Sequence, residues 1–174
     1  MKTTHLYQKE VTLQADRRQI SAELIKIISD LWYEKSIEIV LFRNQLIDKN
    51  VSEILNLHEY AGAFVGKPIS IFNSIDIARA LSEIQLPPSK LDIGKLTYEF
   101  GLEEDKYPSA RYFVMEKLKK AKSSKEINPK DVVLYGFGRI GRLLARELVS
   151  KTGKGDQLRL RAIVIREKND AITL

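Results

Sequence analysis

The sequence contains no cysteine and only two histidines, His5 and His58, among its 174 residues. Without cysteine, the chain cannot form disulfides, bind a metal through thiolates or use a cysteine nucleophile. Two histidines far apart in the sequence do not indicate a metal site, which needs several ligands at characteristic spacing. The chemistry of this chain must therefore come from other side chains or from its backbone.

Long apolar runs are missing as well. Residues 37–42 form one of the longer ones, but Glu38 interrupts it. It is far shorter than the roughly 20 apolar residues that a membrane-spanning helix needs. The N-terminal residues also lack the apolar core of a secretory signal. We therefore expect a cytoplasmic protein with no membrane partner.

The composition, with 44% hydrophobic and 30% charged residues, is that of a globular protein. Its net charge of +6 is spread unevenly. Residues 1–110 hold 13 basic and 16 acidic side chains, whereas residues 111–174 hold 16 basic and 7 acidic ones. The basic final third indicates either attraction to an anionic partner, such as a nucleotide phosphate or a nucleic acid, or simply a solvated charged face.

Helical periodicity dominates the first 122 residues. Apolar residues recur at helical spacing within residues 10–33, and a similar spacing in residues 37–42 favours a second helix over a strand. Together with the segments described next, the pattern predicts an all-helical bundle, that is, a mainly α N-terminal domain over residues 1–122.

Capping and breaking residues divide this helical part. The expected helix starts and stops, in chain order, are Asn50 or Ser52 (start), Gly66 to Pro68 (stop), Asn73 or Ser74 (start), Pro87 and Pro88 (stop), Ser89 (start of a short helix through Leu91 and Leu96), and Pro108 (first turn of a basic helix). The polar residues 123–130 then form the expected linker to a second domain over residues 131–174.

A different pattern follows the linker. Residues 132–135 are β-prone and lead into the G-x-G-x-x-G pattern Gly136-Phe137-Gly138-Arg139-Ile140-Gly141. Residues 142–149 are predicted to be helical, residues 153–156 a turn, and residues 158–165 a second strand. This order predicts the βαβ start of a doubly wound α/β (Rossmann) domain.

Each glycine has a role in such a turn. Gly136 allows the tight exit from the strand, Gly138 leaves room for a pyrophosphate, and Gly141 lets the helix lie close to the strands. The helix N-terminus then offers backbone N–H groups to the phosphates. The alternative is a tight strand–helix turn that uses glycine without binding a nucleotide.

The end of the second strand bears on cofactor choice. An acidic residue there usually binds the ribose hydroxyls of NAD, whereas an arginine accommodates the 2′-phosphate of NADP. Here Arg166 and Glu167 are adjacent. NAD and NADP therefore both remain open, as does a merely exposed pair of charges.

The glycine turn closely resembles the N-G-F-G-R-I-G-R signature of the glyceraldehyde-3-phosphate dehydrogenase family, with Tyr135 in place of the first residue. The resemblance implies that Arg139 and Ile140 offer N–H groups to the pyrophosphate and that Phe137 packs near the cofactor. It also implies a glycolytic oxidoreductase with a nicotinamide dinucleotide, forming a homo-oligomer. Residues 41–72 resemble the helical N-terminal extension of the long-form branch of this family.

The chain departs from the family in one respect that matters for catalysis. The family uses a cysteine nucleophile activated by a histidine, and this chain has no cysteine. We therefore expect an inactive N-terminal part of a longer enzyme, whose remainder is its partner. Two alternatives remain: another Rossmann oxidoreductase, and a basic helical module that binds a protein or, with less support, a nucleic acid, because no nucleic-acid-binding motif accompanies the charge.

Overall fold

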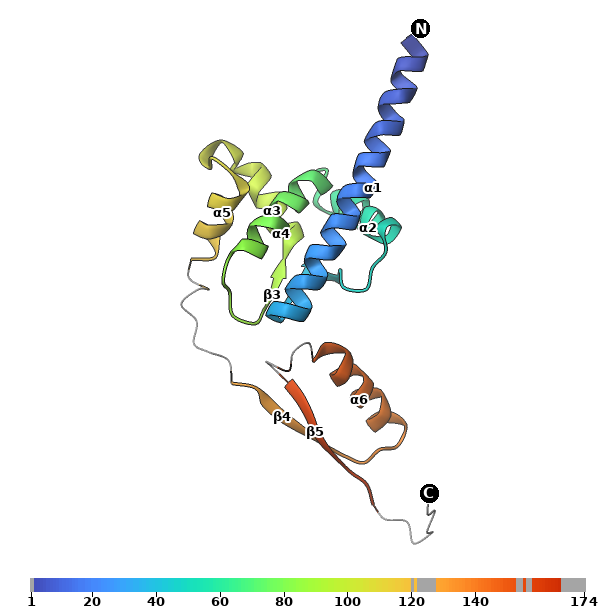
Figure 1. Ribbon diagram of the computed structural model, residues 1–174, viewed down its shortest axis with the longest axis vertical. Coiled ribbons are helices and arrows are strands. Elements are labelled where there is room, and N and C mark those ends of the chain that lie inside the picture. Colours follow the sequence, from blue (N-terminus) through green and yellow to red (C-terminus); the bar gives the residue numbers. More distant parts are fainter. Residues whose placement is uncertain (1, 120, 122–127, 153–154, 156–157, 167–174) are drawn as a thin grey trace. The chain divides into compact units, whose positions relative to one another are not determined.

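The computed structural model describes residues 2–119, 121, 128–152, 155 and 158–166 (Figure 1). The chain divides into two compact units, unit 1 (Met1–Lys125) and unit 2 (Glu126–Leu174). The elements of unit 1 are α1 (Lys2–Lys35), β1 (Ile37–Leu41), β2 (Asn44–Gln45), α2 (Val51–Val65), α3 (Ile71–Glu83), β3 (Ser89–Asp92), α4 (Ile93–Leu102), a 3₁₀ turn (Glu104–Lys106) and α5 (Ala110–Lys117). Those of unit 2 are β4 (Lys130–Tyr135), α6 (Arg139–Lys151) and β5 (Leu158–Val164). Of the predicted linker, residues 123–127 lie outside the described residues, and Lys130 belongs to β4.

Helix α1 contributes only its second half to the core. Leu24, Ile28 and Leu31 recur at helical spacing and are almost completely buried, whereas Leu6 and Tyr7 are exposed. The prediction of a helix over residues 10–33 is confirmed, and the helix extends further at both ends. Within the described residues, even this helix is not apolar enough to cross a membrane, and no other helix is.

A three-stranded mixed sheet lies in unit 1, so the prediction of an all-helical bundle is wrong, although unit 1 is mainly helical. Strand β1 lies in the middle, antiparallel to β2 and parallel to β3, where Ile37 pairs with Ser89. The helix predicted over residues 37–42 is therefore strand β1. Its apolar residues at positions 37, 39, 40 and 41 are all buried. Because both faces of the strand are covered, apolar residues point to both sides of it, and their order along the chain imitates a helical spacing.

Ser89 starts β3 rather than capping a helix, so the predicted start of that helix is wrong. Leu91 lies in β3, and the helix that contains Leu96 is α4, which begins only at Ile93. Asp92 is the N-cap of α4, and its carboxylate accepts hydrogen bonds from the N–H groups of Lys95 (3.1 Å) and Phe42 (3.0 Å). One short side chain thus joins the end of β3, the start of α4 and the β1–β2 turn.

The predicted boundaries of α2 are confirmed. Asn50 and Glu53 form a capping box at its start, and Gly66 ends it in the left-handed conformation at φ +69°. The predicted start of α3 at Asn73 or Ser74 is wrong by a few residues, since the N-cap is Ser70. Ser74 instead lies inside the helix, fully buried.

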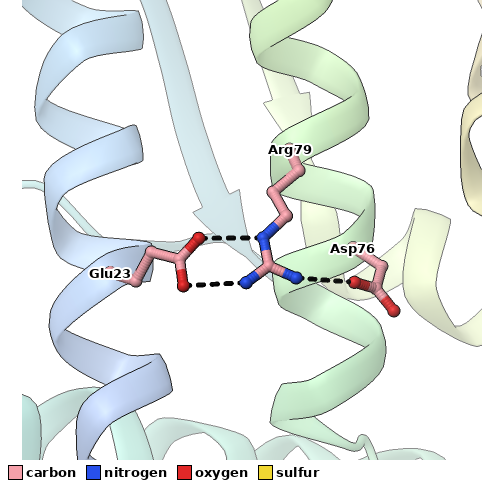
Figure 2. A network of polar contacts seen from close by, with 3 residues as sticks. All are labelled: Glu23, Asp76 and Arg79. Carbon is pink, nitrogen blue, oxygen red and sulfur yellow. Dashed lines mark hydrogen bonds and ion pairs between the residues drawn. The ribbon is translucent and has the colours of Figure 1, made fainter.

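Two polar contacts tie α3 to α1. Figure 2 shows the guanidinium of Arg79 on α3 between the carboxylates of Glu23 on α1 and Asp76 on α3. This arginine donates two hydrogen bonds of 2.8 Å to Glu23 and thereby holds the pKa of that carboxyl below its ordinary value. At the end of α1, Lys35 Nζ donates a hydrogen bond of 2.5 Å to the carbonyl of Ser82 in the last turn of α3.

The basic helix α5 begins at Ala110, so Pro108 precedes the helix rather than occupying its first turn. Phe113 is fully buried and anchors α5 against the ring of Phe100 at 5.3 Å. Lys117 pairs with Glu99 at 3.3 Å and with Glu103 at 3.0 Å, so this cation is neutralised within unit 1.

A polar chain crosses the core of unit 1. His58 is buried, and its Nδ1–H donates to the carbonyl of Ile54 at 2.8 Å. Its Nε2 accepts from the hydroxyl of Ser74 at 3.0 Å, and Ser74 Oγ lies 3.3 Å from Thr97 Oγ1. Burial lowers the pKa of His58 from 6.5, because the charged imidazolium loses its hydration.

This buried histidine predicts a pH dependence of stability. The unfolded chain takes up a proton at His58 near pH 6.5, and the folded chain does so only at lower pH. The stability that the neutral His58 contributes is therefore fully present above pH 6.5, and it falls by up to about 1.4 kcal/mol per pH unit below that pH. Urea unfolding followed through Trp32 at pH 7.5 and 5.5 should show this loss. The His58→Gln variant should lose this pH dependence while His5→Gln keeps it, and equal slopes in the two variants would contradict the assignment.

The turn between β1 and β2 is conformationally demanding. Phe42 and Arg43 both have positive φ, +45° and +76°, which non-glycine residues adopt at a cost. Gly94 on α4 lies directly beneath this turn. A Cβ at Gly94 would come within 2.7 Å of the Phe42 ring and 2.9 Å of the Leu41 side chain, and Leu41 is fully buried.

Two glycines of α4 should respond in opposite directions to the same substitution. Gly94→Ala should destabilise unit 1 by about 1–3 kcal/mol, because the turn and Leu41 must move. Gly101→Ala, where a Cβ meets nothing within 4 Å, should be neutral or stabilise by about 0.5 kcal/mol. Urea titrations of both variants measure the change in the free energy of unfolding. A Gly94→Ala variant as stable as Gly101→Ala would show that the β1–β2 turn accommodates the methyl group at no cost.

Candidate functional site: the glycine turn of unit 2

The glycine turn lies between a strand and a helix of unit 2. Strands β4 and β5 pair in parallel, from Lys130 opposite Leu158 to Tyr135 opposite Val164, and α6 joins them. The predicted order of strand, glycine turn, helix and strand is therefore present. The turn predicted at residues 153–156 lies largely outside the described residues.

Asp131, which the sequence pattern did not point to, links β4 to β5. Asp131 on β4 accepts from Arg159 Nε at 2.9 Å and pairs with Arg161 Nε at 3.2 Å, both on β5. The register shifts just beyond this group, between Val132 and Val133. The two arginines two positions apart in the second strand, Arg159 and Arg161, were the available signal, since alternate residues of a strand share one face.

Gly136 is required by backbone conformation. Its φ is +99°, a value that favours glycine over any residue with a side chain. Its N–H donates to the carbonyl of Val164 on β5 at 2.6 Å, so the turn begins from a position fixed by the sheet.

Gly141 is required by packing. It lies in the first turn of α6, and a Cβ at this position would overlap the carbonyl oxygen of Gly136. The helix can therefore approach the end of β4 only because residue 141 has no side chain.

Gly138 is required neither by its backbone conformation nor by its packing. Its φ of −73° and ψ of −161° are open to residues with side chains, and a Cβ would meet nothing within 4 Å. As the N-cap of α6, it also provides no side-chain hydrogen bond to the helix, a position where serine, threonine, asparagine or aspartate would stabilise more. Nothing within the described structure explains why this residue is glycine.

The start of α6 has an electrostatic arrangement that an isolated helix would not favour. Its first turn contains no acidic residue and instead begins with Arg139, followed one turn on by Arg142. Both arginines are exposed, and neither pairs with a carboxylate in the part of the chain that the structure describes. Cations at a helix N-terminus oppose the positive end of the helix dipole, so the arrangement favours an anion at this place.

The other predicted site residues lie around this turn. Phe137 and Ile140 are exposed, the latter strongly. Arg166 is exposed two residues beyond the end of β5, and Glu167 lies outside the described residues. The structure thus brings residues 136–141 together, while the choice between Arg166 and Glu167 stays a prediction.

Unit 2 leaves much apolar surface exposed. On β4, Val132 and Leu134 are half-buried whereas Val133 and Tyr135 are exposed. On α6, Ala145 is buried, but the exposed residues include Ile140, Leu143, Leu144 and Val149. Two strands and one helix are too few to cover their own apolar faces.

Comparison with known proteins gives one informative similarity. The chain matches no family model. It is 36% identical over 156 residues to a glyceraldehyde-3-phosphate dehydrogenase-like protein from Pseudomonas aeruginosa (strain UCBPP-PA14). The match covers 86% of this chain and 34% of the relative, so the chain spans about a third of the length of the curated relative that it matches. The matched part of the chain is longer than either unit, so the similarity extends into both units.

Proposed function

We propose that this chain is the N-terminal part of an NAD(P)-dependent enzyme of the glyceraldehyde-3-phosphate dehydrogenase type, and that its glycine turn binds the pyrophosphate of the dinucleotide. The observation that carries the proposal is Gly138. Its backbone conformation and its packing both admit a side chain. A phosphate that must approach the backbone gives the missing reason for glycine at this position.

The residues of the turn fit a dinucleotide. The N–H groups of Arg139 and Ile140, in the first turn of α6, have no acceptor within the helix and are suited to donate to phosphate oxygens. The helix dipole and the unpaired charges of Arg139 and Arg142 add attraction for the anion. The nicotinamide, when bound, supplies the hydride acceptor, and this chain contributes only the position of the phosphates.

The similarity to the relative supports the enzyme class. It covers most of this chain and extends into unit 1, which fits the resemblance of residues 41–72 to a helical N-terminal extension. Under this proposal the remainder of the enzyme and a second copy are the partners of the chain. The exposed apolar faces of β4 and α6 fit such a partner surface.

The alternative, a basic module for nucleic acid or protein, has weaker support. Lys117 on the basic helix α5 is engaged by Glu99 and Glu103. Arg159 and Arg161 on β5 are likewise engaged by Asp131. These basic residues are therefore not free to bind a nucleic acid or an acidic protein surface.

Substitution of Gly138 should separate binding from folding. Calorimetric titration of NAD and NADP into the full chain should give affinities weaker than micromolar, since only part of the dinucleotide crevice is present. Gly138→Val should reduce binding at least tenfold, because its side chain occupies the phosphate position, while its thermal unfolding stays close to that of the wild type.

Gly101→Ala on α4 is the matched glycine control and should bind as the wild type does. Submicromolar affinity in the wild type, or undiminished binding by Gly138→Val, would refute the assignment of this turn as the phosphate site. A preference between NAD and NADP of tenfold or more would indicate which of Arg166 and Glu167 faces the ribose.

The chain by itself should not catalyse the oxidation of glyceraldehyde 3-phosphate. The reaction of the family needs a cysteine thiolate, and this chain contains no cysteine. A steady-state assay with the aldehyde, inorganic phosphate and either dinucleotide should stay at the blank rate. Turnover that copurifies with the chain and is lost in Gly138→Val would contradict the expectation that this chain has no catalytic groups of its own.

A further inference from the structure

A cavity is lined entirely by residues of unit 1. Its volume is about 640 Å³, within the range of small-molecule sites. It is bounded by Arg17 on α1, by Leu55, His58 and Ala63 on α2, and by the segment from Gly66 to Phe72 that enters α3.

The walls of this cavity are mostly apolar. Leu55, Ile69, Ile71 and Phe72 line it, and Ile69 and Ile71 are buried. His58 adds no free polar group, because both of its ring nitrogens are already hydrogen-bonded to Ile54 and Ser74. A ligand with a substantial apolar body would therefore fit these walls better than a fully hydrated ion.

Two cations face this cavity without a partner. Arg17 is half-buried and Lys67 is exposed, and neither forms an ion pair with any carboxylate among the described residues. Glu59 also lines the cavity, but it pairs with neither of them. Arg79, two turns further along α3, differs from these two cations, since it is engaged by two carboxylates. A half-buried guanidinium without a carboxylate is an open position for an anionic group.

The start of α3 reinforces this charge. Ser70, Ile71 and Phe72 line the same cavity, so the N-terminal end of α3 opens onto it. The N-cap Ser70 makes no side-chain hydrogen bond to the helix, and the first turn contains no acidic residue. The positive end of the helix dipole therefore adds to the charges of Arg17 and Lys67.

We propose that this cavity binds a small amphipathic carboxylate. Its carboxylate contacts the guanidinium of Arg17 with help from Lys67, and its apolar body lies against Leu55, Ile69 and Phe72. The proposal does not depend on the glycine turn, because the cavity is built entirely from unit 1.

Octanoate and octanamide form a matched pair of probes, equal in length and different in charge. Calorimetric titration into the full chain should show octanoate binding at least tenfold more tightly than octanamide. Arg17→Gln should remove about tenfold of the affinity for octanoate, because it removes a charge-assisted contact. Lys67→Gln should remove about two- to fivefold, since Lys67 is more exposed. Arg18→Gln, the neighbouring arginine on α1 that does not line the cavity, should bind octanoate unchanged.

Amide chemical shifts locate the bound probe. Octanoate should shift the signals of Gly62, Ser70 and Phe72, and these shifts should vanish in Arg17→Gln. Since Arg17 has no ion-pair partner to lose, the variant should unfold at the wild-type temperature and its binding data stay interpretable. Equal affinity for octanoate and octanamide, unchanged binding in Arg17→Gln, or shifts confined to β4, α6 and β5 would each overturn the proposal.

Discussion

The burial of strand β1 on both of its faces is the constraint on which unit 1 depends. It pairs with β2 on one edge and β3 on the other. Its residues Ile37 and Leu41 are completely buried. A strand that is covered on both faces requires an apolar layer on each side, and α1, α2 and α4 all contact it. These three helices provide the apolar layers that cover it.

The polar groups of unit 1 reinforce that arrangement at the points where elements end. Asp92 joins the β1–β2 turn to the start of α4. Lys35 and Arg79 connect α1 with α3 at two levels. The His58–Ser74–Thr97 chain pairs three polar side chains inside the core, where an unpaired one would cost about 1–3 kcal/mol. Packing therefore sets the architecture, and hydrogen bonds at the ends of elements fix its details.

Several features that are decided locally were predicted from the sequence, although the starts of α3 and α4 were misplaced. The capping box at Asn50, the left-handed Gly66 and the strand–glycine–helix–strand order of unit 2 depend on residues within a few positions of one another. Strand β1 was predicted as a helix because its pairing with β3 joins residues about 50 positions apart, a contact that no local pattern reveals. The cavity around Arg17 was missed for the same reason, since Arg17 and the rest of its walls, residues 55–72, lie far apart in the sequence.

The three glycines of the turn in unit 2 differ in what would keep them during evolution. Gly136 and Gly141 are held by conformation and by packing, so any descendant that folds this way must retain them. Gly138 is free of both demands, and a ligand at the helix N-terminus, as proposed above, would give a reason to preserve it. Under the proposed function, a lineage that abandoned nucleotide binding would keep the outer two glycines, while the middle one would be free to change. The middle position alone would then distinguish relatives that still bind a dinucleotide from those that keep only the shape of the turn.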